Sequence, residues 1–160
     1  MLQSKPRREF SVWCQLKNRG FDVFYPCLRV NTVNPRARGI EPYFPEYIFV
    51  QVDLTAIGAS TFAWIPHAIG LVYFGNEPAW VPDAVVFAIQ RHLAAINSDS
   101  KQSDDQGRYL FPGKAAMDQN KPSDSLNLII GEHLPSDERV HGLFQLLSTA
   151  FVSTPRKESL

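Results

Sequence analysis

An alternating pattern between residues 43 and 54 constrains the fold of this chain more than any other feature. In a β-strand, successive side chains point to opposite faces. One face of this run is aliphatic and is expected to point into a core: Ile48, Val50, Val52 and Leu54. The other face places two aromatic residues beside two polar ones: Tyr47, Phe49, Gln51 and Asp53. Because a solvated face rarely needs aromatic side chains, we expect either another layer of the same domain or a partner to cover Tyr47 and Phe49.

Composition indicates a soluble globular protein with a basic N-terminal sector. The 160 residues, 44% of them hydrophobic, are enough for one medium domain or two small ones. The net charge is zero, yet residues 1–40 contain eight Lys and Arg against two acids, a local net charge of +6. Such a sector suits contact with phosphates, although surface basic residues often serve only to keep a protein hydrated.

The cysteines and the hydropathy pattern argue against several classes of protein. Cys14 and Cys27 have neither the Cys-x-x-Cys spacing nor neighbouring histidine pairs, so we expect two buried thiols without a disulfide or a metal site. The chain starts without an apolar signal-peptide core, and its most apolar stretch, 62–74, is too short to span a bilayer. We therefore expect a cytoplasmic protein that needs no cofactor and makes no membrane contact.

The first part of the chain reads as alternating helices and strands. Ser4 or Lys5 as N-cap and Gly20 as terminator predict a helix that carries Lys5, Arg7 and Arg8 in its first turn. Cations are unfavourable there because of the helix dipole, which hints at an anionic partner. Residues 21–30 and 43–54 are expected to pair as antiparallel strands around a basic loop. A short helix, a strand, a tight turn and a second helix are expected to follow: 56–64, 70–74, 75–78 and 81–95.

A change of composition divides the chain into two units. Residues 97–108 contain no aliphatic or aromatic side chain and are expected to form a flexible linker between a domain at 1–96 and a small domain at 109–160. The segment 137–151 suits both strand and helix, because several of its apolar residues also have helical spacing. These are Val140, Leu143, Phe144 and Leu147.

Four sequence blocks, in this order, resemble the NusG family of transcription elongation factors, and in particular its RfaH-like members. The most specific are Phe44-Pro45-Glu46-Tyr47-Ile48-Phe49-Val50 and the turn from Phe74 to Pro82; the others are 5–9 and 20–26. The resemblance implies an α+β fold, with an N-terminal antiparallel sheet flanked by helices. It further implies a linker and then a small KOW-type β-barrel, with a helical hairpin as the alternative.

Three departures from the family pattern accompany this resemblance. The Gly-Pro-Phe-x-Gly turn of the KOW motif is replaced by residues 120–124, which leaves contact with a ribosomal protein or with the Rho terminator open. Only residues 1–4 precede the expected first helix, so the central first strand of the family is expected to be missing and the chain to be truncated or compromised. His67 stands where the family often has Gly.

By resemblance, the chain is expected to be a monomeric factor that docks on the clamp helices of RNA polymerase and suppresses pausing or termination. The residues expected to contact polymerase are Tyr47, Phe49, Phe44, Pro45, Trp64, Phe74, Ser60 and Thr61. Those expected to contact the single-stranded DNA of the transcription bubble are Lys5, Arg7, Arg8, Arg36 and Arg38.

The sequence also bears on two other functional classes. An enzyme is disfavoured because the sequence contains no dinucleotide or phosphate-binding glycine motif and no nucleophile elbow, and its four histidines are scattered. An RNA-binding module that acts without polymerase is the alternative, since aromatic residues on a sheet face beside arginines also suit base stacking. In that case Tyr47 and Phe49 would contact bases.

Overall fold

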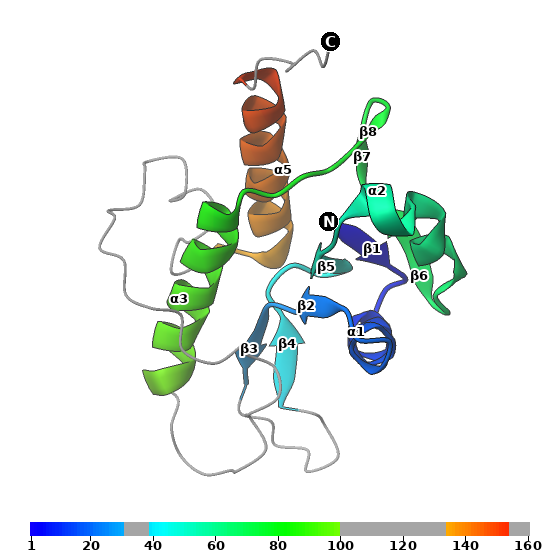
Figure 1. The fold of residues 1–160 in the computed structure, drawn as a ribbon. Coiled ribbons are helices and arrows are strands. Elements are labelled where there is room, and N and C mark those ends of the chain that lie inside the picture. The colour runs from blue at the N-terminus through cyan, green and yellow to red at the C-terminus, as the bar shows by residue number, and fades with distance from the viewer. Residues whose placement is uncertain (31–38, 100–133, 154–160) are drawn as a thin grey trace.

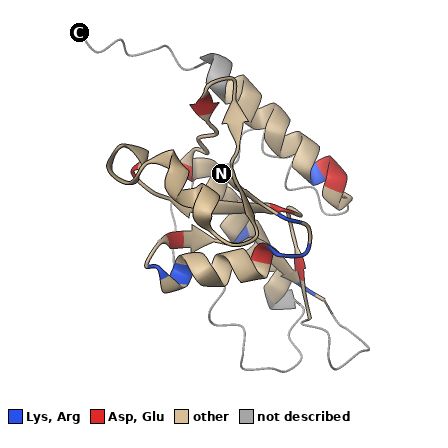
Figure 2. Ribbon diagram, turned by 90° about the vertical axis from the view of Figure 1, so that its right-hand side faces the viewer, with Lys and Arg blue, Asp and Glu red and all other residues tan. Residues whose placement is uncertain are grey.

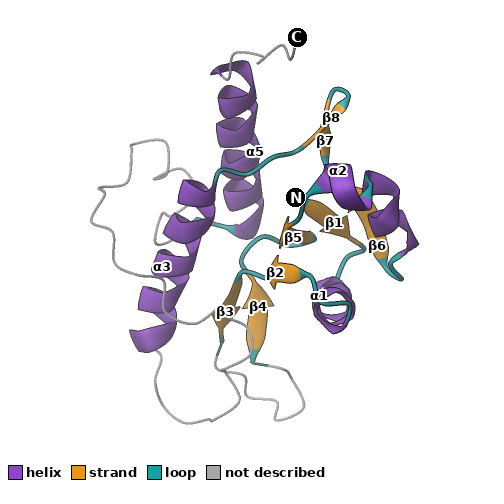
Figure 3. Cartoon of the chain, in the orientation of Figure 1, coloured by secondary structure: helices purple, strands orange, loops and turns teal. Residues whose placement is uncertain are grey.

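The computed structural model describes residues 1–30, 39–99 and 134–153, and its centre is a four-stranded antiparallel sheet (Figure 1). The strand order is β2-β5-β1-β6. These strands span Leu2–Ser4 for β1, Asp22–Phe24 for β2, Tyr47–Gln51 for β5 and Ala68–Leu71 for β6. Helices lie on both faces of the sheet, so the predicted α+β architecture is confirmed (Figure 3).

The expectation that the first strand is missing was wrong. β1 lies between β5 and β6, and Leu2 pairs with Ile48 on one side and with Leu71 on the other. The strand was overlooked because three residues are too short to display a period of two. Leu2 is completely buried, so this short segment completes the centre of the sheet.

Helix α1, Glu9–Asn18, begins later than the sequence suggested. Arg7 adopts a left-handed backbone with φ 61°, which a right-handed helix cannot contain, and Arg8 is the N-cap. Lys5, Arg7 and Arg8 are therefore exposed in the turn before the helix and do not belong to its first turn. Figure 2 shows the Lys and Arg residues of the described chain in blue on the ribbon. The first turn instead contains Glu9, an acid of the sign that the helix dipole favours.

The predicted strand 21–30 is two strands, because Tyr25 and Pro26 separate β2 from β3, Cys27–Arg29. β3 pairs with β4, Ile40–Pro42, in a two-stranded hairpin, while β2 pairs with β5. The predicted antiparallel pairing of the two regions is therefore confirmed. Arg36 and Arg38 lie outside the described residues.

Short elements connect the sheet to the last two helices. The predicted helix at 56–64 consists of α2, Leu54–Ile57, and the 3-10 helix η1, Ala59–Trp64. The predicted strand 70–74 is divided between β6 and β7. Of the predicted turn 75–78, the first two residues join β7 to β8 and the last two form β8. The remaining elements are β7, Tyr73–Phe74; β8, Glu77–Pro78; α3, Asp83–Asp99; and α5, Ser136–Ser153.

Helix α3 extends into the segment predicted to be linker. Asn97 is buried at its C-terminal end, where its side-chain oxygen accepts from the Arg29 N–H at 2.8 Å and its amide donates to the Cys27 carbonyl at 3.2 Å. The side chain thus acts like one more peptide group beside β3. Of the predicted linker, residues 97–99 are helical, and the rest lies outside the described residues.

The two faces of the sheet contribute to two separate cores. The α1-side cluster contains buried residues from β1, α1, β2, β5 and η1, chiefly Leu2, Val12, Trp13, Leu16, Val23, Ile48 and Phe62. The α5-side cluster joins the other face to α3 and α5, chiefly through Phe24, Tyr43, Phe44, Phe49, Ile89, Leu93, Leu143 and Leu147. Helix α5 is thus part of a core, although a long stretch of chain separates it from α3.

Candidate protein-docking site

Strand β5 distributes its side chains between the two clusters as its alternation predicts. Ile48 is completely buried in the α1-side cluster, and Val50, Val52 and Leu54 pack against that cluster. Phe49 belongs to the α5-side cluster, and Tyr47 packs against it. The prediction of a core face and an aromatic face is therefore confirmed.

Helix α5 covers the aromatic face. The Phe144 ring contacts Tyr47 at 5.3 Å and Phe74 at 5.9 Å between ring centroids. Leu143 and Leu147, on the same helix, are completely buried. Of the two covers that the sequence allowed, the structure contains another layer of the same chain. Residues 136–153 form a single helix, as one arm of the predicted helical hairpin would, and not strands of a β-barrel. The predicted second arm lies outside the described residues.

The two aromatic residues of β5 differ in accessibility. Phe49 is 5% exposed and stacks on Phe24 at 5.9 Å. Tyr47 is only half-buried; partial burial, together with the nearby Glu46 carboxylate, raises the pKa of its hydroxyl. Phe49 is therefore a core residue of the sheet, while Tyr47 belongs to the surface that α5 covers.

A buried cation lies within the interface between α5 and the sheet. Arg139 is 8% exposed and its guanidinium lies over the Tyr43 ring, 4.2 Å from the centroid. One terminal nitrogen donates to the Ser136 hydroxyl at 2.9 Å, but the buried Nε has no hydrogen-bond partner among the described residues. The cation–π contact offsets only part of the cost of desolvating a charge.

The sequence interpretation did not single out Arg139, although a signal was present. Arg139, Leu143 and Leu147 are spaced at intervals of four, so they share one stripe of a helix. An arginine in line with two apolar residues is a candidate for the buried face of the helix.

The residues expected to contact polymerase do not form one surface. Phe44 is completely buried, and Phe74 lies beside Phe144. The half-buried Pro45 lines a separate cavity of about 380 Å³. The other three belong to η1, which packs against the edge strand β6: Ser60, Thr61 and Trp64. The structure therefore brings together Tyr47, Phe49, Phe44 and Phe74, but not the rest.

The described residues expected to contact nucleic acid are all exposed: Lys5, Arg7 and Arg8. Arg7 lines the same 380 Å³ cavity as Pro45. Beneath this turn, the buried Glu9 carboxylate accepts from the Glu46 N–H at 3.0 Å and so joins the start of α1 to the loop before β5. This role of Glu9 was not predicted from the sequence. The available signal was an acidic residue in the first turn of a helix.

The family described as transcription termination factor nusG matches residues 1–90, more than half of the chain. The chain belongs to the NusG family. Among curated proteins, no sequence matches it. Proteins of this family are transcription elongation or termination factors without enzymatic activity, and they bind RNA polymerase. The described residues contain no helix long and apolar enough to cross a membrane.

Proposed function

We propose that this NusG-family protein is an RfaH-like factor that docks on the clamp helices of RNA polymerase and suppresses pausing or termination. The observation that carries the proposal is the aromatic face of β5, held beneath a helix that lies outside the matched residues 1–90. An aromatic sheet face that is covered by a separate helix could bind the polymerase clamp helices in place of α5.

Removal of α5 would uncover the surface that polymerase needs. Tyr47 and Phe74 lose the Phe144 ring, and the buried residues around Tyr43 lose Leu143 and Leu147. Burial of each large aromatic side chain contributes about 1.5–3 kcal/mol, so two or three of them are enough for a stable interface. In this proposal α5 and the polymerase clamp helices compete for one surface, and the C-terminal unit 109–160 controls access to it.

The basic turn before α1 supplies the proposed contact with nucleic acid. Lys5, Arg7 and Arg8 are exposed together and are not involved in the α5-side cluster. We propose that they contact phosphates of the transcription bubble while the aromatic face contacts protein. A change of salt concentration should then affect the nucleic-acid contact more than the apolar one.

The test is capture of the purified full chain on core RNA polymerase. Leu143→Glu, which places a charge in the α5 interface, is expected to raise capture about tenfold by releasing the helix. Adding Tyr47→Ala should remove most of that gain. Gln145→Glu changes the charge on the exposed side of the same helix and should leave capture unchanged. Amide spectra of β1 and β5 establish that each variant retains the sheet.

The proposal fails if the released variant does not bind polymerase, or if Tyr47→Ala binds as well as its parent. Binding of free RNA that is lost with Tyr47→Ala, in the absence of polymerase binding, would instead establish the base-stacking module. Phe49→Ala is unsuitable for this test, because Phe49 is a core residue whose loss would affect folding.

A further inference from the structure

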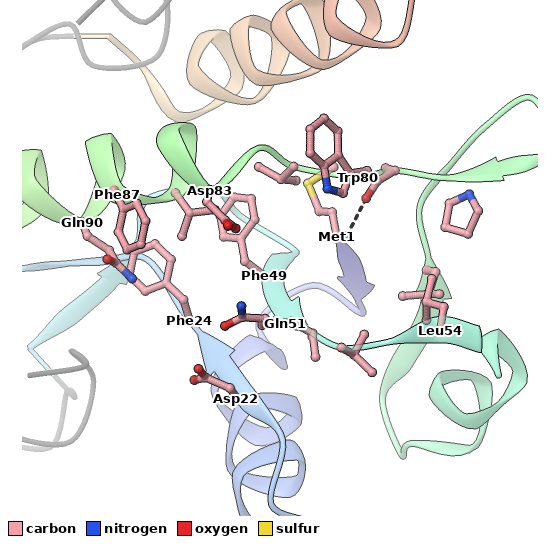
Figure 4. A pocket seen from close by; sticks show the side chains of 17 residues that line it. Met1, Asp22, Phe24, Phe49, Gln51, Leu54, Trp80, Asp83, Phe87 and Gln90 are labelled. Carbon is pink, nitrogen blue, oxygen red and sulfur yellow. Dashed lines mark hydrogen bonds between the residues drawn. The ribbon is translucent and has the colours of Figure 1, made fainter. Parts of the chain in front are cut away.

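A second surface lies between the sheet and the start of α3, where a cavity of about 510 Å³ opens (Figure 4). Its walls come from β2, β5, the segment 78–81 and the first two turns of α3. None of its described lining residues belongs to α5. The cavity is therefore available while α5 covers the aromatic face.

Aromatic side chains form the wall and the rim of this cavity. Phe24 and Phe49 line it from the sheet. Trp80 and Phe87, which also line it, are 60% and 51% exposed. Two large exposed aromatic residues beside one cavity are typical of a surface that binds a partner.

The Met1 amino group at this cavity already donates to the Ala79 carbonyl at 2.9 Å, and burial lowers its pKa to about 6. Four other side chains that line the cavity have oxygen atoms that suit a cationic donor. They are two carboxylates and two amides: Asp22, Asp83, Gln51 and Gln90. No Lys or Arg occurs among the described residues that line it. The Asp22 Oδ1 atom lies 3.6 Å from Nζ of the exposed Lys17 and forms an ion pair with it. Asp83 has no ion pair within the described part of the chain. Figure 4 shows Asp83 on α3 and Gln51 on β5 pointing into the cavity from opposite sides.

We propose that this cavity binds an arginine side chain carried by an apolar segment of a partner protein. The planar guanidinium can stack on Trp80 or Phe87 while it donates hydrogen bonds to Asp83 and to the amide oxygen of Gln51. A lysine ammonium fits less well, because it is more strongly hydrated and does not stack. The volume accommodates the arginine together with one neighbouring apolar residue, which would contact Phe24.

Asp83 has a second role that the test must separate from binding. It lies in the first turn of α3, where a carboxylate also stabilises the helix dipole. Asp137 occupies the corresponding place in the first turn of α5 and is exposed. Asp137→Asn is therefore the matched control, since it removes an equivalent helix contribution far from the cavity lining.

The probes are the peptide acetyl-Leu-Arg-Leu-amide and its counterpart with citrulline, which keeps the shape of arginine without its charge. Each is titrated into the full chain, and the backbone amides and the Trp80 indole N–H are followed by NMR. The arginine peptide is expected to shift Trp80 and Phe87 but not the exposed Trp64. Loss of a charge-assisted hydrogen bond should weaken binding about tenfold with citrulline and with Asp83→Asn. Asp137→Asn and Trp64→Ala should bind as the wild type does.

Equal affinity for the citrulline peptide, or an unchanged affinity in Asp83→Asn, would overturn the proposal. So would shifts confined to α5 or the absence of any shift at millimolar peptide. Because neither RNA polymerase nor release of α5 enters the measurement, the result is independent of the docking function proposed above.

Discussion

The two faces of the central sheet are covered in different ways. The α1-side cluster is closed by α1 and η1, which lie next to the sheet strands along the chain. Its buried residues are apolar, although Trp13 Nε1 has no hydrogen-bond partner among the described residues. The α5-side cluster is closed partly by α5, which is separated in the chain from the end of α3 at Asp99 by residues 100–135 and which buries Arg139. We expect the first cover to open less readily than the second.

The physical difference lies in how each cover is attached. The residues that join α1 to the sheet are few, so closing that contact costs little chain entropy. Helix α5 is connected through residues 100–135, and its interface contains a guanidinium whose Nε has no hydrogen-bond partner in the described ranges. The α5 contact is therefore easier to open. Closing the longer connection costs more chain entropy, and burying the charge costs desolvation free energy.

The largest expected effect is on the α1-side cluster. Phe62 is completely buried in η1 and packs against Phe21 at 5.5 Å between ring centroids. Phe62→Ala should lower the free energy of unfolding by about 3–5 kcal/mol, because it leaves a large cavity. Urea unfolding followed by circular dichroism measures this loss. Trp64→Ala in the same segment is the control; its side chain is 84% exposed, so the change should stay within about 0.5 kcal/mol.

On the α5 side, Leu143→Ala should have a local effect. The side chain is completely buried, and its truncation should weaken the α5 contact by about 2–5 kcal/mol. Hydrogen exchange should show faster exchange for the amides of α5 but unchanged protection in β1 and β5. Gln145→Ala, on the exposed side of the helix, should not alter the exchange of α5. If β1 and β5 lose protection together with α5, the two faces form one cooperative unit and the comparison is wrong.

Alkaline pH should weaken the α1-side cluster through Cys27. Burial raises the pKa of this thiol to about 11 from its usual value of 9, although the charge of Arg29 opposes the shift. Because the folded state keeps the proton longer than the unfolded state, stability is full below pH 9 and falls as the pH rises towards 11. The loss is at most roughly 2–3 kcal/mol.

Urea midpoints at pH 8 and pH 11 measure this loss. Between the two pH values, the urea midpoint of Cys27→Ala should fall less than that of the wild type. The midpoint of Cys14→Ala, which keeps Cys27, should fall as much as that of the wild type. The same slope in Cys27→Ala as in the wild type would assign the loss to other groups, among them Tyr43, whose pKa burial also raises.

The smallest expected effect is a gain at the edge of the sheet. His67 adopts φ 71°, a left-handed conformation that glycine tolerates and that explains why a glycine suits this position. Relief of this strain should raise the free energy of unfolding by about 1–2 kcal/mol. The extra conformational freedom of glycine in the unfolded chain should lower it by about 0.5–1 kcal/mol. His67→Gly should therefore raise the unfolding free energy by roughly 0.5–1 kcal/mol, measured by urea unfolding. His67→Ala keeps the strain and should show no gain.

Several elements could be predicted because their signals are local. The alternation of β5 placed Ile48 and Phe49 on opposite faces, and the helical spacing of Val140, Leu143 and Leu147 left the helical state of α5 open. Elements that depend on distant contacts were missed. Leu2 becomes part of a central strand because β5 and β6 lie on either side of it, and Asn97 is held at the end of α3 partly by hydrogen bonds with β3.

The pleat of a strand is a property of neighbouring residues, so the order of side chains from Tyr47 to Val50 was enough to assign an aliphatic face and an aromatic face. The cover of the aromatic face is not a local property. It depends on whether Phe144 and Leu143, almost a hundred residues later, gain more by packing there than the chain loses by closing the loop. That balance is settled by contacts in three dimensions, and in the function proposed here it would also set how readily a partner replaces α5.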